Sequence, residues 1–122
     1  MATVELTTDT FRETIDEHDL VLVDFWADWC GPCHMFAPTY EQASQANPDV
    51  VFGKVDTEAE QELAAAFRIM SIPTLMVFRE QVLVYSQPGA LPPQALDELI
   101  AKARELDMDE VRRQLAEQEA SV

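Results

Sequence analysis

The chain has 122 residues, of which 48% are hydrophobic, and its 23 acidic and eight basic side chains give a formal charge of -15. This length fits one compact domain and is too short for two ordinary ones. The acidic charge is spread along the chain and argues against binding to nucleic acid or anionic membranes, because phosphate binding needs clustered Lys and Arg. No apolar run reaches the roughly 18 residues of a membrane span, and no secretion signal opens the chain, so we expect a cytoplasmic protein.

The first third of the chain predicts a helix, a strand and a second helix. A helix around Phe11 and Ile15 precedes the run Leu20–Trp26, which is β-branched and aromatic and apolar on both faces, as is typical of a central strand. The following helix would begin near Pro32, since proline suits a first helical turn, and Pro38 would kink it.

The middle of the chain continues the alternation. The run 50–55 predicts another strand, and the pattern Thr57-x-x-Glu60 is a capping box that would open a helix reaching Phe67. Two further apolar runs, 74–78 and 82–85, are close enough to form a hairpin, although the residues between them include no Gly or Asn.

A last apolar stripe, at Leu96, Leu99, Ile100 and Ala103, predicts a helix after Pro92-Pro93. The resulting order is βαβαβ followed by ββα. It implies an α/β fold with a mixed sheet of about five strands and helices on both faces.

Cys30 and Cys33 are the two cysteines of the chain and the first candidates for chemistry. They stand at the predicted start of a helix, where exposed amides and the helix dipole favour a thiolate at Cys30. Cys33, one turn further along, is placed to attack the mixed disulfide that Cys30 forms with a substrate, which releases reduced product and leaves the two cysteines bridged. The spacing therefore predicts thiol–disulfide exchange.

Two other interpretations of the cysteine pair are less well supported. A structural zinc site needs about four ligands, and His18 and His34 are the two histidines that accompany the cysteines, so we expect no metal. An incidental pair of buried cysteines would not need Trp29, Gly31 and Pro32 around it.

The run 23–33, VDFWADWCGPC, resembles the active-site segment of thioredoxins of the bacterial type, and so do Pro38, Ile72-Pro73-Thr74 and Gly89. The resemblance extends from about residue 3 to residue 105. It implies the thioredoxin fold and a general protein-disulfide reductase that maintains cell redox homeostasis through Cys30 and Cys33. It also implies that the chain binds no cofactor, takes electrons from NADPH through thioredoxin reductase, reduces disulfide-containing client proteins and is a monomer.

Asp24 interrupts the apolar strand ahead of the cysteines, and burial there would drive its carboxyl group toward the neutral form. The resemblance implies that Asp24 accepts the proton of Cys33; a strand-end carboxylate facing water is the alternative. Lys54 would lie in the neighbouring strand, where its charge would partly offset the cost of ionising Asp24. An ordinary edge lysine with its amine in solvent is the alternative for Lys54.

The remaining site residues would form the surface around the sulfur atoms. The resemblance implies that Gly31 and Pro32 set the reactivity of the pair and that the Ile72–Pro73 peptide bond is cis, opposite the cysteines, where the backbone of Ile72 can pair with an extended substrate segment. We expect Trp26 to pack in the core beneath. The expected substrate-binding surface comprises Trp29, Ile72, Pro73, Pro88, Gly89 and Ala90.

Three features depart from the family pattern: His34, the hairpin residues Glu80-Gln81 and the segment 106–122. We expect His34 to be a solvated surface residue, the alternative being a pH-sensitive influence on Cys30 or on substrate choice. Residues 1–105 would form the thioredoxin domain. Residues 106–122 would form an acidic helical extension that packs loosely, or alternatively binds a partner, with a narrow apolar stripe at Leu106, Met108, Val111 and Leu115.

Two rival functions complete the set. A disulfide oxidase or isomerase is disfavoured because Gly31-Pro32 resembles the reducing members of the family, whereas oxidising members tend to place His in that dipeptide. A binding module that holds client chains, for example as a chaperone, is disfavoured as the sole role because both cysteines are intact.

Overall fold

The structure is a computed structural model that describes residues 2–120. Its centre is a five-stranded sheet with the strand order β1-β3-β2-β4-β5. The strands are β1 (Thr3–Glu5), β2 (Leu20–Trp26), β3 (Val51–Asp56), β4 (Thr74–Arg79) and β5 (Val82–Pro88). The first three strands are parallel, whereas β4 runs antiparallel to both of its neighbours, β2 and β5. The mixed sheet confirms the fold class expected from the sequence.

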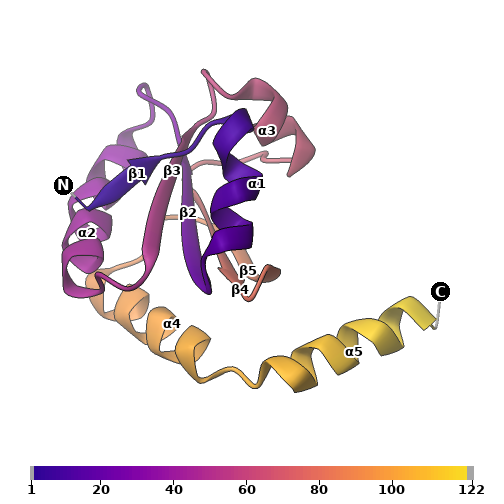
Figure 1. Ribbon diagram of the computed structural model, residues 1–122. Helices are drawn as coiled ribbons and strands as arrows, with labels where there is room; N and C mark the ends of the chain where they lie inside the picture. Colours follow the sequence, from indigo (N-terminus) through magenta and orange to yellow (C-terminus); the bar gives the residue numbers. More distant parts are fainter. Residues whose placement is uncertain (1, 121–122) are drawn as a thin grey trace.

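Helices cover both faces of this sheet (Figure 1). They are α1 (Thr8–Glu17), α2 (Gly31–Ala46), α3 (Gln61–Ala66), α4 (Pro93–Glu105) and α5 (Met108–Ala120). One core layer joins α2 and α4 to the sheet through residues such as Phe36, Tyr40 and Leu96. The other joins α1 and α3 to the opposite face through Phe11 and Leu63. Strand β2 is buried along nearly its whole length, which explains why it is apolar on both faces.

The capping box expected at Thr57 and Glu60 is wrong. The Thr57 hydroxyl and amide both donate to the carbonyl oxygen of Trp26, at 3.1 and 2.9 Å, so Thr57 is tied to the end of β2. Helix α3 begins later, at Gln61, and Glu60 precedes it without a side-chain capping bond. A capping box does occur at Thr7, before α1.

The hairpin of β4 and β5 is confirmed, and its turn uses two residues with left-handed backbone. Glu80 and Gln81 have φ angles of 50° and 72°, a region that Gly and Asn enter more readily. The turn is bound to the end of α1 and to the segment after it: the Gln81 side chain donates to the Asp16 carbonyl at 3.1 Å, and the Glu80 amide donates to the Asp19 carbonyl at 2.7 Å. These long-range bonds hold a turn that the local sequence does not favour.

The last helix, α5, points away from the body of the molecule (Figure 1). Its first residue, Met108, is buried, and Arg112 pairs with Glu80 at 2.8 Å. Beyond that pair the helix is exposed, and Leu115 retains 40% of its accessible surface. The C-terminal helix is thus confirmed, while the division into a domain of residues 1–105 and an extension of residues 106–122 stays a prediction. None of the helices described is long and apolar enough to cross a membrane.

Candidate active site

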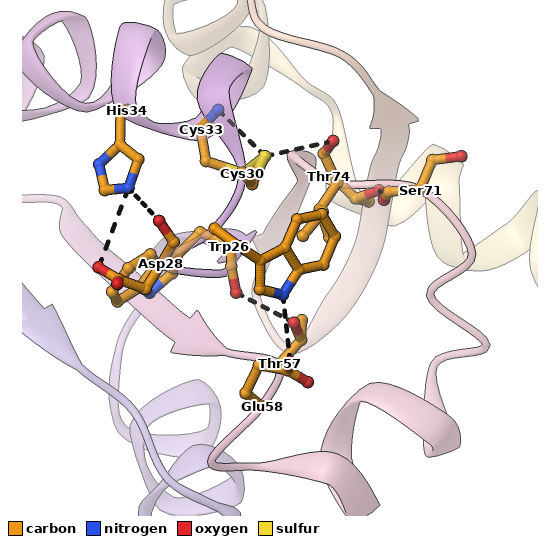
Figure 2. Close-up of a disulfide and its surroundings, with 11 residues drawn as sticks. Trp26, Asp28, Cys30, Cys33, His34, Thr57, Glu58, Ser71 and Thr74 are labelled. Carbon is orange, nitrogen blue, oxygen red and sulfur yellow. Dashed lines mark hydrogen bonds and ion pairs between the residues drawn. A yellow bond between two sulfur atoms is a disulfide. The ribbon is translucent and has the colours of Figure 1, made fainter.

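Cys30 and Cys33 form a disulfide at the start of α2, with their Cα atoms 5.3 Å apart (Figure 2). Cys30 is the N-cap residue of the helix, and its sulfur accepts a hydrogen bond from the Cys33 amide at 3.2 Å. Gly31 and Pro32 occupy the first positions of α2, and proline there needs no N–H partner. The helix dipole and the first-turn amides therefore favour negative charge on Cys30.

The cis peptide bond between Ile72 and Pro73, expected from the resemblance, is present. The Ile72 carbonyl oxygen lies 3.7 Å from the Cys30 sulfur, so this loop and the start of α2 meet at the disulfide. Gly89 joins the same place, because its amide donates to the Pro73 carbonyl at 2.7 Å and its φ angle of 106° suits glycine. Pro88 and Ala90, on either side of Gly89, are exposed. The structure thus brings Ile72, Pro73 and Gly89 together beside Cys30.

An apolar groove runs beside the disulfide. Trp29 is 70% exposed and Met70 is 92% exposed, and both line the groove together with Ala64, Ile69 and Ile72. An exposed pair of large apolar side chains in one groove is typical of a surface that binds another chain. Met70 was missed by the sequence analysis, although an apolar residue in the turn just before Ile72 was a usable signal.

Glu58 is a second residue that the sequence analysis missed. Its carboxylate accepts a hydrogen bond from the Trp29 indole N–H at 3.1 Å. The two residues are 29 positions apart in the chain, and no local pattern signals their pairing. The bond orients an otherwise exposed indole next to the disulfide.

Asp24 is 1% exposed, so the water-facing alternative is wrong. Within residues 2–120 neither of its carboxyl oxygens has a hydrogen-bond partner. The pKa of Asp24 is raised from 3.8 to about 7, chiefly by burial; the Lys54 charge opposes this rise and the Glu5 charge adds to it. Lys54 is the register partner of Asp24 on β3, a central strand, so it is not an edge lysine. Its amine lies 4.8 Å from the centroid of the Trp26 ring.

Trp26 and His34 lie next to the disulfide on different elements. Trp26 is half-buried and packs against the cluster of Ala27, Cys30 and Cys33, as expected. His34 lies at the surface, as expected, and its Nε2 atom is 2.6 Å from the Asp28 carbonyl oxygen (Figure 2). His34 is thus tied to the loop that precedes Cys30. No group of three or more His, Cys, Asp or Glu in the described residues could hold a metal ion.

Comparison with known proteins agrees with this geometry. The thioredoxin family model matches residues 2–102. A Streptomyces coelicolor protein designated a thioredoxin 2 is 63% identical over 119 residues, which cover 98% of this chain and 89% of that protein. Thioredoxin of Bacillus subtilis is 42% identical over 103 residues, 84% of this chain and 98% of its own. A mutant thioredoxin of Halobacterium salinarum superposes with a TM-score of 0.78 at 33% identity, covering 85% of this chain and 91% of that one.

The two sequence relatives differ in how they match the C-terminus. The Streptomyces match spans 98% of this chain and therefore includes most of α5, whereas the Bacillus match takes up 98% of that protein with 84% of this chain. Over residues 2–102, which the family model matches, the fold and the cysteine pair at the start of α2 both point to the same family. The chain therefore belongs to the thioredoxin family, and it is a protein-disulfide reductase that works by dithiol–disulfide exchange through Cys30 and Cys33.

Proposed function

We propose that Cys30 is the attacking nucleophile, that Cys33 is the resolving cysteine and that Asp24 accepts its proton. The Cys30 thiolate attacks one sulfur of a client disulfide, forms a mixed disulfide and expels the other client sulfur as a thiolate. Cys33 then passes its proton to Asp24 and attacks the Cys30 sulfur. The Cys30–Cys33 disulfide forms, the second client thiolate leaves, and the client has gained two electrons.

One observation supports the assignment of Cys30 as the attacking cysteine and Cys33 as the resolving one: Cys30 is the N-cap residue of α2. Its sulfur accepts the Cys33 amide hydrogen bond at 3.2 Å, and this bond together with the helix dipole stabilises a thiolate at Cys30. Pro32 holds the backbone φ that a first helical turn needs, and Gly31 places no side chain between the sulfurs and a client. These two residues are the ones that we propose set the reactivity of the pair.

The burial of Asp24 supports its role as proton acceptor. A pKa of about 7 lets a carboxyl group both take up and release a proton near neutral pH, which is what general acid–base chemistry requires. Lys54 lowers the pKa of Asp24 and so limits the rise that burial causes. We therefore assign Lys54 the role of adjusting Asp24.

The surface around Cys30 is where a client would bind. The exposed Trp29 and the apolar groove beside it offer a contact for an apolar client side chain. The backbone of Ile72, whose carbonyl lies 3.7 Å from the Cys30 sulfur, would pair with an extended client segment. Pro73, Pro88, Gly89 and Ala90 would complete this surface, since the Pro73 carbonyl and the Gly89 amide are bonded to each other.

Membership of the thioredoxin family supports a proposal for the source of electrons and for the cellular compartment. Oxidised protein would be returned to the dithiol form by NADPH through thioredoxin reductase, and the chain itself would hold no cofactor. It would act in the cytoplasm as a monomer on disulfide-containing clients. Residues 1–105 would be sufficient for catalysis, with residues 106–122 as an extension.

The roles of the two cysteines are tested by trapping. Cys33→Ser removes the resolving thiol, so the reduced variant should accumulate stable mixed disulfides with insulin on Cys30, visible by mass spectrometry. Cys30→Ser is the matched control and should form few such adducts. Equal trapping by the two variants, or trapping by Cys30→Ser alone, would overturn the assignment. Wild-type protein that fails to turn over insulin disulfides would count against the proposed mechanism as a whole.

A further inference from the structure

Three charged side chains lie in a row across three neighbouring strands of the sheet. Lys54 on β3 is the register partner of Glu5 on β1 and also the register partner of Asp24 on β2. Residues in register on parallel strands present their side chains to the same face of the sheet. The backbone of Lys54 therefore lies between those of an exposed and a buried carboxylate residue, while its ammonium group lies 4.8 Å from the centroid of the Trp26 ring.

The face on which the row lies is the one that α2 covers. Leu22 and Phe52, two residues before Asp24 and Lys54 on their strands, pack in the same core layer as the α2 residues. Leu6, the residue after Glu5, points to the opposite layer, as the alternation along a strand requires. Strand β1 is held to α2 because the Thr3 hydroxyl donates to the Glu41 carboxylate at 3.0 Å. Glu5 thus has a fixed place at the outer end of the row.

We propose that Glu5 is a positioning residue for the redox reaction: from the edge strand, on the same face of the sheet and two strands away, its negative charge makes Asp24 hold its proton more tightly. The inference deepens the proposed function and depends on it only for the effect on rate. The Glu5 charge acts on Asp24 in this direction, opposite to that of Lys54. Glu5 is exposed at the edge of the sheet; partial burial raises its pKa, the Lys54 charge lowers it and the Asp56 charge raises it.

The other groups that face Asp24 come from α2 and β4. The Tyr40 hydroxyl of α2 is engaged elsewhere, because it donates to the Gly53 carbonyl at 2.8 Å. From β4, the register partner of Asp24 is the apolar Leu75. At the start of α2 stand the two cysteines, which do not titrate while they form a disulfide. Asp56, two residues after Lys54 on β3, lies on the same face of the sheet as Lys54.

The size of the effect follows from the spacing of strands. Two strand spacings place the Glu5 and Asp24 backbones about 10 Å apart. At that distance a unit charge shifts a titration by about 0.3 to 1 pH unit, depending on how much water screens the pair. Neutralising Glu5 should therefore lower the pH at which Asp24 is half-protonated by roughly 0.5 unit.

The test is an NMR titration of the Asp24 side-chain carboxyl carbon in the oxidised protein, where the cysteines are silent. Glu5→Gln should lower the Asp24 midpoint by about 0.5 pH unit. Glu13→Gln removes an equal charge from an exposed position on α1 and is the matched control; it should leave the midpoint unchanged. Coincident midpoints for wild type and Glu5→Gln, or an equal shift in Glu13→Gln, would overturn the inference.

Two further measurements separate the parts of the inference. In a Lys54→Met background, Glu5→Gln should still lower the Asp24 midpoint by about 0.5 pH unit, because the repulsion between the two carboxylates is direct; a shift that vanishes would refute direct action of the Glu5 charge on Asp24. The acid limb of the pH–rate profile for insulin reduction should move with the Asp24 midpoint. A midpoint that moves while the rate profile stays fixed would support the effect of Glu5 on Asp24 and refute the proton-acceptor role of Asp24 itself.

Discussion

Replacing Asp24 by asparagine should stabilise the oxidised protein, and by an amount that grows with pH. The Asp24 side chain is 1% exposed and its oxygens are unpaired within the described residues, so ionising it inside the fold costs free energy that ionising it in the unfolded chain does not. Its pKa of about 7 lies roughly three units above the ordinary value of 3.8. At about 1.4 kcal/mol per unit, this amounts to at most about 4 kcal/mol.

The direction in which the free energy of unfolding changes with pH follows from the protons that the folded and unfolded states bind. Between pH 4 and pH 7 the folded protein holds the Asp24 proton and the unfolded chain has lost it, so the free energy of unfolding falls as the pH rises through this window. Asparagine is neutral throughout and removes this dependence. The variant should therefore match the wild type near pH 4 and exceed it by up to about 4 kcal/mol above pH 8.

Urea unfolding of both oxidised proteins at pH 4, 6 and 8 measures the difference. A difference in the free energy of unfolding that is the same at every pH would reflect how the buried amide packs. The prediction concerns how that difference changes with pH. Two parallel stability profiles would contradict this prediction, because they would mean that Asp24 titrates alike in the folded and unfolded states.

Four more outcomes are expected. Asp24→Asn should slow insulin reduction at pH 7 with the fold retained, and an unchanged pH–rate profile would remove Asp24 from the mechanism. Gly53→Ala should cost about 1 to 3 kcal/mol in urea unfolding, since the new Cβ would overlap the Leu6 side chain and stand 3.3 Å from a backbone oxygen; no loss would mean that Leu6 moves freely. Tyr40→Phe should cost about 1 to 2 kcal/mol by the same assay through its lost 2.8 Å hydrogen bond, and an undiminished stability would contradict this. Deleting residues 112–122, which removes one exposed ion pair with the hairpin, should leave insulin reduction within about twofold and cost at most about 1 kcal/mol; a larger loss of activity would assign the extension a catalytic role.

The parts of the site that could be predicted from the sequence are local. The strand Leu20–Trp26 and the pair Cys30 and Cys33 stand within one short stretch, where apolar pattern and cysteine spacing act together. Asp24 was recognised because a charge inside an apolar run has few interpretations. The cis bond before Pro73 came from the family resemblance, since most such bonds are trans.

The parts that could not be predicted depend on contacts between distant segments. Strand β1 has three residues, too few for a periodic pattern, so the place of Glu5 beside Lys54 emerges from strand pairing alone. The bond from Trp29 to Glu58 likewise joins separate loops. Thr57 fits a capping pattern and was misassigned because its partner, the Trp26 carbonyl, belongs to another strand.

Cys30 and Cys33 form a reducing dithiol if the mechanism proposed above is right, and a redox titration of the pair is the decisive measurement. Thioredoxins in general have potentials of about -270 mV, a family value and not one worked out from this structure. We expect the midpoint of the Cys30–Cys33 pair to lie in that region. A midpoint near the roughly -120 mV of strong dithiol oxidants would contradict it, because such a pair would take electrons from client thiols and leave client disulfides intact.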